Sequence, residues 1–144
     1  MLAVCSGGGH LEQLLCLKPS LGDYVSLCTT VDLTDDSLDF SVIYKVSDCN
    51  KNSIFKTLKS FFSVGKLIVG LKPGLIISTG AAPGVIAIFW GRLIGAKTIW
   101  IDSIANVEQL SMSGKLAGKL AHVWLTQWPH LEKAEGPKYW GNVL

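Results

Sequence analysis

Long apolar runs are missing from this sequence. Its 144 residues contain no stretch of about 20 consecutive apolar side chains, so we expect no helix that spans a bilayer. Met1 leads directly into a short apolar segment and not into a signal peptide, which favours a cytoplasmic protein.

Paired metal-ligand motifs are also missing. The four cysteines form no CxxC pair, and no histidine lies at metal-ligand spacing from them. We therefore predict no metal site. Cys5 and Cys28 lie within apolar runs typical of strands, and together with Cys16 and Cys49 they are expected to be reduced, buried thiols.

Several catalytic signatures are absent as well. A dinucleotide fingerprint that starts at Gly7 needs a third glycine at position 12, where Glu12 stands, so an NAD-dependent oxidoreductase is disfavoured. No Gly-Lys pair is followed by Ser or Thr, which excludes a Walker loop, and no G-x-S-x-G occurs. No Asp-x-Asp is present to hold a diphosphate-bound cation, because Asp35 and Asp36 are contiguous. We predict no cofactor.

Charged residues are scarce, at 17% against 49% apolar residues, and they are unevenly spread. The first 50 residues carry net charge −5 and the remaining 94 carry +7. So few charges predict an apolar surface that a partner or a membrane covers. A basic second part fits phosphate-bearing ligands or an anionic membrane surface, and a solvated basic face is the alternative. We predict no nucleic-acid partner.

A glycine run near the N-terminus is the main feature that is present. The segment 6–10 reads Ser-Gly-Gly-Gly-His, follows the apolar run 2–5 and precedes residues with helical spacing. Gly7, Gly8 and Gly9 let the backbone turn sharply and approach a ligand closely. The helix that follows, with His10 in its first turn, would add free N–H groups and the positive end of its dipole.

Strand and helix patterns alternate along the rest of the chain. This order predicts one α/β domain over residues 1–144, with a Rossmann-like, mostly parallel sheet covered by helices on both faces. The first helix is expected to end at about Lys18, before Pro19. Strands are predicted at 2–5, 24–28, 40–46, 75–78, 97–101 and 123–126, and residues 138–144 are predicted to be a final strand or an exit segment. Further helices are predicted at 53–71, 85–94, 114–121 and 128–133.

Three loops are expected at the carboxyl-end edge of this sheet, where such folds bind ligands. They are 6–10, 79–84 and 102–105, and they supply the candidate acceptor-binding residues Gly7, Gly8, Gly9, Thr79, Gly80 and Ser103. His10 could accept a proton from a sugar hydroxyl, or it could only hydrogen-bond the loop backbone. Asp102 could bind a hydroxyl, act as a base or cap the following helix.

Five segments appear in an order that resembles a known family. They are Ser6-Gly7-Gly8-Gly9-His10, Ile77-Ser78-Thr79-Gly80 with Pro83-Gly84, Trp100-Ile101-Asp102-Ser103, Leu110-Ser111-Met112-Ser113-Gly114-Lys115 and Gln127-Trp128-Pro129. The sequence is similar to the membrane-associating subunit of the two-component UDP-N-acetylglucosamine transferase of dolichol-linked oligosaccharide synthesis, and to bacterial exopolysaccharide glycosyltransferase subunits.

This resemblance implies the N-terminal, acceptor-side domain of an inverting GT-B glycosyltransferase. A partner subunit would supply the UDP-sugar, and the acceptor would be a lipid-diphosphate-linked saccharide at the cytoplasmic face of the membrane. His10 is then the first candidate base and Asp102 the second, standing where the family more often has Glu. The lack of an N-terminal membrane helix favours a peripheral, bacterial-type subunit, with truncation of a longer protein as the alternative.

Two helices are candidates for membrane contact. In the helix 53–71, six apolar residues recur at helical spacing and are expected to face the sheet, with the lysines opposite; they are Ile54, Leu58, Phe61, Phe62, Ile68 and Val69. The alternative is a basic amphipathic helix on a membrane. The apolar helix 85–94 is either wholly buried or partly membrane-facing. A non-catalytic membrane adaptor that recruits the catalytic subunit is therefore the alternative function.

Overall fold

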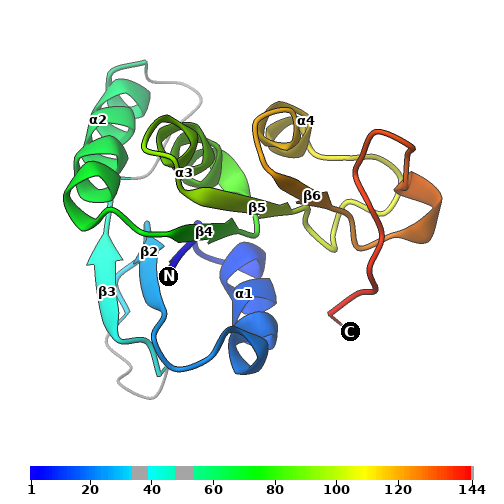
Figure 1. The fold of residues 1–144 in the computed structure, drawn as a ribbon, viewed down its shortest axis with the longest axis horizontal. Coiled ribbons are helices and arrows are strands. Elements are labelled where there is room, and N and C mark those ends of the chain that lie inside the picture. Colours follow the sequence, from blue (N-terminus) through cyan, green and yellow to red (C-terminus); the bar gives the residue numbers. More distant parts are fainter. Residues whose placement is uncertain (34–38, 48–53, 144) are drawn as a thin grey trace.

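Six short strands form one parallel sheet of order β3-β2-β1-β4-β5-β6 in the computed structural model, which describes residues 1–33, 39–47 and 54–143 (Figure 1). The strands are β1 Leu2–Val4, β2 Ser26–Thr29, β3 Val42–Lys45, β4 Leu75–Ser78, β5 Lys97–Ile101 and β6 Val123–Leu125. The helices are α1 Gly9–Leu21, α2 Ile54–Leu71, α3 Ala81–Leu93, α4 Met112–Gly118 and the short 3-10 helix η2 Pro129–Leu131. The predicted Rossmann-like parallel sheet is confirmed.

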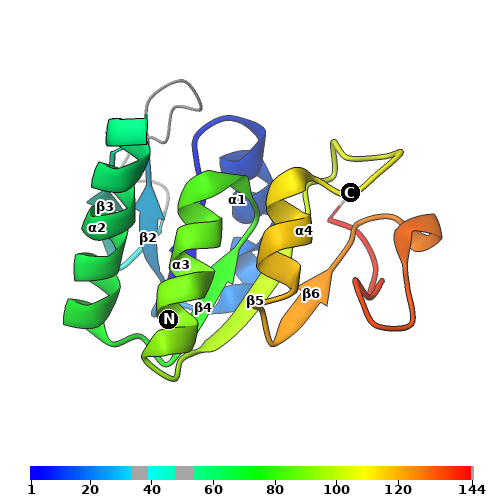
Figure 2. The same ribbon diagram turned by 90° about the horizontal axis from the view of Figure 1, so that it is seen from above.

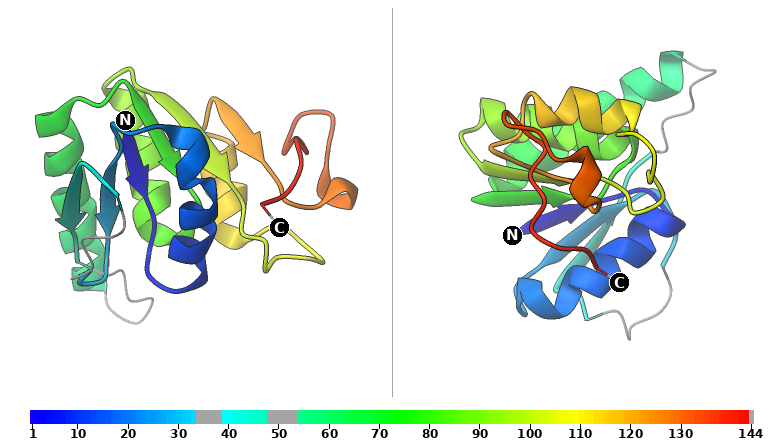
Figure 3. Two further views of the ribbon diagram at one scale, coloured as in Figure 1. Left: turned by 90° about the horizontal axis from the view of Figure 1, so that it is seen from below. Right: turned by 90° about the vertical axis from the view of Figure 1, so that its right-hand side faces the viewer.

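Helices cover both faces of this sheet. α1 lies alone on one face, while α2, α3 and α4 lie side by side on the other (Figures 1 and 2). The opposite placement of α1 is also visible from below and from the side in Figure 3. Both faces must be covered because successive residues of a strand point to opposite sides of the sheet, and β1 has buried apolar residues on both sides. Leu2 and Val4 join the core under α2 and α3, whereas Ala3 and Cys5 join the one under α1.

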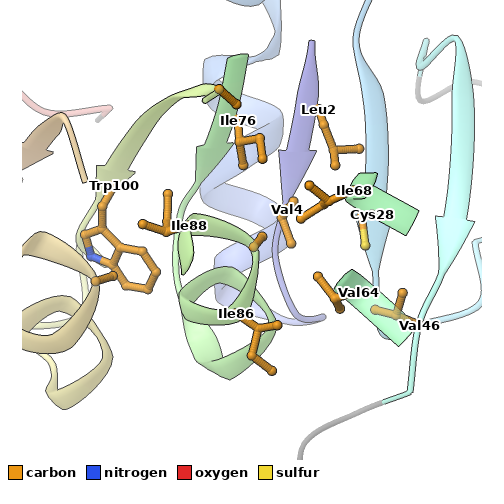
Figure 4. Close-up of a cluster of buried hydrophobic side chains, with 13 residues drawn as sticks. Leu2, Val4, Cys28, Val46, Val64, Ile68, Ile76, Ile86, Ile88 and Trp100 are labelled. Atoms are coloured by element: carbon orange, nitrogen blue, oxygen red, sulfur yellow. The ribbon is translucent and has the colours of Figure 1, made fainter. Parts of the chain in front are cut away.

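The larger core packs sheet residues against α2 and α3. Ile76 and Trp100 from the sheet meet Ile88 of α3, and Val4 meets Ile68 of α2 (Figure 4). All five side chains are fully buried. Fully burying such a side chain stabilises the fold by roughly 1.5–3 kcal/mol, so this layer holds the strand ends, and hence their loops, in place.

The predicted bounds of three α-helices were wrong, and the helix predicted at 128–133 is the shorter 3-10 helix η2. α1 continues through Pro19 to Leu21; a proline in the last turn removes one backbone bond, and Leu21 still packs on the core under α1. α3 begins at Ala81 and not at 85, with Pro83 in its first turn, where no intrahelical N–H is required. α4 spans Met112–Gly118 and not 114–121, because the Ser111 hydroxyl accepts a bond from Gly114 N–H at 2.7 Å and caps the helix.

The described residues after β6 contain no further strand, so of the two alternatives for 138–144 the structure agrees with an exit segment over 138–143. Only one bridge, between Leu125 and Lys138, pairs this segment with the sheet. Leu144 and the acidic pair Asp35-Asp36 lie outside the described residues, as does Cys49. Cys5 and Cys28 are buried as predicted, whereas Cys16 is exposed and the prediction for it was wrong.

The predicted core face of α2 was wrong in part. Ser60, Val64 and Ile68 point into the protein and are fully buried. Leu58, Phe62 and Val69 are instead exposed, on the same side as the exposed lysines. Both faces of α2 carry apolar residues, so the spacing alone did not show which stripe packs on the sheet.

Candidate functional site

A cavity of about 770 Å³ lies at the carboxyl-end edge of the sheet. It sits where the chain order reverses, because β1 has β2 on one side and β4 on the other. The three loops predicted to meet at this edge do meet. Its lining residues are Ser6, Gly7, Gly8, His10, Thr30, Val31, Thr57, Ala81, Ala82, Pro83, Ser103, Ala105, Asn106, Ser111 and Ser113.

The glycine run forms one wall of this cavity. Gly8 has φ 68°, in the left-handed region that glycine adopts without strain, and it turns the chain from β1 into α1. Gly7 and Gly8 line the cavity, whereas Gly9 is the first residue of the helix. His10 follows in the first turn of α1 and lines the cavity beside them.

His10 and Thr79 hold each other by two hydrogen bonds. The His10 Nδ1–H donates to the Thr79 carbonyl oxygen at 3.1 Å, and the Thr79 hydroxyl donates to the His10 carbonyl oxygen at 2.7 Å. Since a carbonyl oxygen only accepts, this contact assigns the ring proton to Nδ1. The neutral ring then keeps a lone pair on Nε2, which is the form that a general base requires.

Gly80 makes room for the His10 ring. A Cβ at position 80 would lie 2.3 Å from both Cε1 and Nδ1 of His10. Gly80 also has φ 145° and ψ −173°, a region that side-chain-bearing residues rarely adopt. Thr79 and Gly80 therefore support the ring from behind rather than line the cavity.

Asp102 is engaged in local structure. Its side chain is 2% exposed and does not line the cavity. One carboxylate oxygen accepts from Ser103 N–H at 3.1 Å and from the Ser111 hydroxyl at 2.6 Å. The other accepts from Ser111 N–H at 3.0 Å. This geometry favours a role for Asp102 in holding the start of α4. Its neighbour Ser103 lines the cavity, whereas Asp102 does not.

Hydroxyl groups that were not among the predicted site residues complete the lining. Ser6, Thr30, Thr57, Ser111 and Ser113 all contribute to it. Ser6, Ser111 and Ser113 lie in two of the five segments that carry the family resemblance, and this resemblance is the signal that could have found them. Thr30 and Thr57 come from segments with no recognisable motif, and only the packing of β2 and α2 brings them here.

Within 1–33, 39–47 and 54–143, no three His, Cys, Asp or Glu side chains gather to hold a metal ion. No helix in those ranges combines the length and apolar character that crossing a membrane requires.

Solved structures share this fold. MurG of Acinetobacter baumannii superposes with a TM-score of 0.77 at 18% identity; the match covers 98% of this chain and 44% of MurG. A UDP-N-acetylglucosamine 2-epimerase of Methanocaldococcus jannaschii has a TM-score of 0.56 at 10% identity, covering 87% of this chain and 38% of that one. The expected likeness to a GT-B glycosyltransferase is thus confirmed at the level of fold.

Sequence relatives specify the family. Rat, human and mouse proteins named UDP-N-acetylglucosamine transferase subunit ALG14 are 34%, 28% and 26% identical. Each match covers all of this chain and 82% of the relative. The family described as "Oligosaccharide biosynthesis protein Alg14 like" matches residues 20–143. The chain therefore belongs to the Alg14-like family of oligosaccharide biosynthesis proteins.

Proposed function

We propose that this chain is the acceptor-binding subunit of a two-component inverting glycosyltransferase. The reaction would move a sugar from a UDP-sugar to a lipid-diphosphate-linked saccharide. The observation that carries the proposal is the bond from His10 Nδ1–H to the Thr79 carbonyl, which leaves Nε2 as an acceptor in a side chain that lines the cavity.

The chemistry that follows is a single displacement. Nε2 of His10 takes the proton of the acceptor hydroxyl as its oxygen forms a bond to the anomeric carbon. The bond from that carbon to the donor's diphosphate breaks, and UDP leaves with the electron pair. Proton removal in such a transition state typically contributes about 10²–10⁴-fold in rate.

The lining supports a neutral, hydroxyl-rich ligand. The described residues around the cavity include no Lys, Arg, Asp or Glu. Besides His10, their polar side chains are the hydroxyl groups of serine and threonine and the amide of Asn106. Sugars are recognised by such neutral hydrogen-bonding groups, whereas a diphosphate generally recruits cations. We therefore assign the acceptor's sugar to this cavity. The UDP-sugar is assigned to a partner chain, since the mouse, human and rat relatives are named subunits of a transferase.

The helix layer supports membrane association at the cytoplasmic face. α2, α3 and α4 contain no acidic residue. On α2 we define the stripe Phe55, Lys59, Phe62, Lys66 and Val69, whose members follow one another at helical spacing and are all exposed. Apolar side chains would enter the lipid boundary while the lysine ammonium groups meet anionic headgroups.

The test of the catalytic proposal is transfer by the chain reconstituted with its partner subunit. His10→Ala is expected to abolish transfer without weakening subunit association, while the control His122→Ala, at the opposite edge of the sheet, leaves transfer unchanged. Full activity of His10→Ala would remove His10 from catalysis and favour the alternative, a non-catalytic membrane adaptor.

The membrane role is tested separately by vesicle flotation. Reversing the charge of Lys59 and Lys66 to Glu is expected to lower the floated fraction severalfold. The matched control reverses the charge of Lys133 and Lys138 to Glu, and these two residues lie after β6 and outside the helix layer. Unchanged flotation of the Lys59 and Lys66 variant would exclude this stripe as the membrane contact.

A further inference from the structure

The buried side-chain amide of Gln13 connects α1, the helix that carries His10, to the loop 102–106, which forms another wall of the cavity. Gln13, in α1, is only 3% exposed. Its Nε2–H donates to the Asp102 carbonyl oxygen at 3.1 Å, and its Oε1 accepts from Ile104 N–H at 3.0 Å. Only one orientation of the amide satisfies both bonds, because one partner accepts and the other donates.

The same loop is held from its other side. Trp128 Nε1–H donates to the Ile104 carbonyl oxygen at 2.9 Å. Both backbone polar groups of Ile104 are thus bonded to side chains, one from α1 and one from the segment after β6. Ser103, Ala105 and Asn106, which flank Ile104, line the cavity. Their position is therefore set largely through Ile104.

Gln13 and His10 are three residues apart on one helix. Residues at this spacing lie on neighbouring turns of the same side of a helix, so a rigid helix fixes the ring relative to the amide. Because the amide holds Asp102 and Ile104, it also fixes the separation between the His10 ring and the wall that carries Ser103.

We propose that Gln13 is a positioning residue, which sets the distance between His10 and the Ser103–Asn106 wall. This rests on the transferase function proposed above. The acceptor hydroxyl must lie within hydrogen-bond reach of Nε2, and a displacement of about 1 Å can cost on the order of 100-fold in rate. Gln13 does not line the cavity, so it acts through the loop and not by touching the acceptor.

The test compares Gln13→Met with Gln109→Met, which makes the same change at an exposed site on the same loop. In the reconstituted pair, with UDP-N-acetylglucosamine and a prenyl-diphosphate-linked sugar, Gln13→Met should raise the acceptor KM about tenfold and lower kcat by about 10–100-fold. The donor KM and the control should not change. A lower kcat with unchanged acceptor KM is what mere loss of folded protein gives, and it would overturn the proposal.

Amide hydrogen exchange supplies a readout that needs no activity. The Ile104 amide should exchange about tenfold faster in Gln13→Met than in Gln109→Met, since it loses its acceptor. Equal exchange would overturn the positioning role even if transfer fell. Absence of transfer by the wild-type pair would overturn the proposed function, whereas the exchange rates would still show whether Gln13 holds the Ile104 amide.

A second variant, Gln13→Glu, keeps the proposal testable if Gln13→Met folds poorly. Gln13→Glu keeps the length and the acceptor for Ile104 N–H, and it places an ionised carboxylate oxygen, which cannot donate, against the Asp102 carbonyl oxygen. If Gln13→Glu raises the acceptor KM severalfold and leaves the donor KM unchanged, the result supports the proposal. Wild-type values of both KM would overturn it.

Discussion

At the scale of single residues, Gly80 is the most sharply constrained position of the site. Its φ is 145°, and a Cβ at this position would lie 2.3 Å from the His10 ring, so both backbone and space oppose any larger residue. We expect Gly80→Ala to destabilise the protein by about 1–3 kcal/mol and to abolish transfer, because the ring must move. Urea unfolding and the transfer assay measure the two effects.

Gly74→Ala is the matched control for this substitution. No atom lies within 4 Å of a Cβ built at position 74, and its φ is not in the left-handed region. This variant should keep both stability and transfer. Wild-type transfer by Gly80→Ala would show that the ring orientation described here is not needed for the reaction.

The cysteines differ in reactivity at the same scale. Burial raises the pKa of the Cys5 and Cys28 thiols to about 12. At pH 8 to 9 both therefore stay protonated and shielded, and only the thiolate reacts. We expect a maleimide to label exposed Cys16 in the folded protein, with Cys5 and Cys28 labelled only after unfolding. Peptide mass spectrometry resolves the sites, and rapid labelling of Cys5 at pH 8 would contradict their burial.

At the scale of elements, the start of α4 depends on Asp102. The carboxylate accepts from two groups of Ser111, and a Cβ on Gly114 would lie 2.8 Å from either oxygen, so the helix packs directly on it. We expect Asp102→Asn to lower the free energy of unfolding by about 1.5–3 kcal/mol, the range for a hydrogen bond to a charged group. The folded fraction should retain transfer.

Glu108→Gln is the control for Asp102→Asn, because it makes the same change at an exposed carboxylate of the same loop. It should leave stability unchanged. Loss of transfer by Asp102→Asn at wild-type stability would reverse the assignment and make Asp102 a catalytic residue.

Elements also show what sequence patterns could and could not predict. β4 and β5 were predicted with their observed bounds, since each is a short apolar run between turn residues. The packing side of α2 was not, because Phe62 and Val69 are as apolar as Val64 and Ile68. The packing of α2 on the sheet and on α3 decides which side of the helix is buried, and no local sequence pattern shows that packing.

At the scale of the whole molecule, the sheet topology made the site predictable in outline. Parallel strands place the loops after β1, β4 and β5 at one edge, so His10, Thr79 and Ser103 were expected near one another. The buried bonds of Gln13 and Trp128 to Ile104 were not predictable, because they join residues 91 and 24 positions apart. Such contacts depend on the final packing and leave no periodic signal.

The charge distribution of the whole chain leads to a further prediction. The layer of α2, α3 and α4 holds basic and no acidic residues, and it exposes Leu93, Met112 and Leu116 besides the α2 stripe. α1, on the other face, has no such excess of basic residues, because it carries one acidic and one basic residue, Glu12 and Lys18. An anionic surface should therefore attract the protein with the helix layer facing it.

Flotation with vesicles of different composition tests this orientation. We expect binding to vesicles that contain anionic phosphatidylglycerol and little binding to pure phosphatidylcholine. Raising the salt from 0.1 M to 1 M shortens the Debye length from about 10 Å to about 3 Å, so binding should weaken severalfold. Part of the binding should persist at 1 M salt, because salt does not screen the contact of exposed apolar side chains such as Phe62 with lipid. Equal binding to neutral vesicles at both salt concentrations would show that the basic layer does not direct the protein to the membrane.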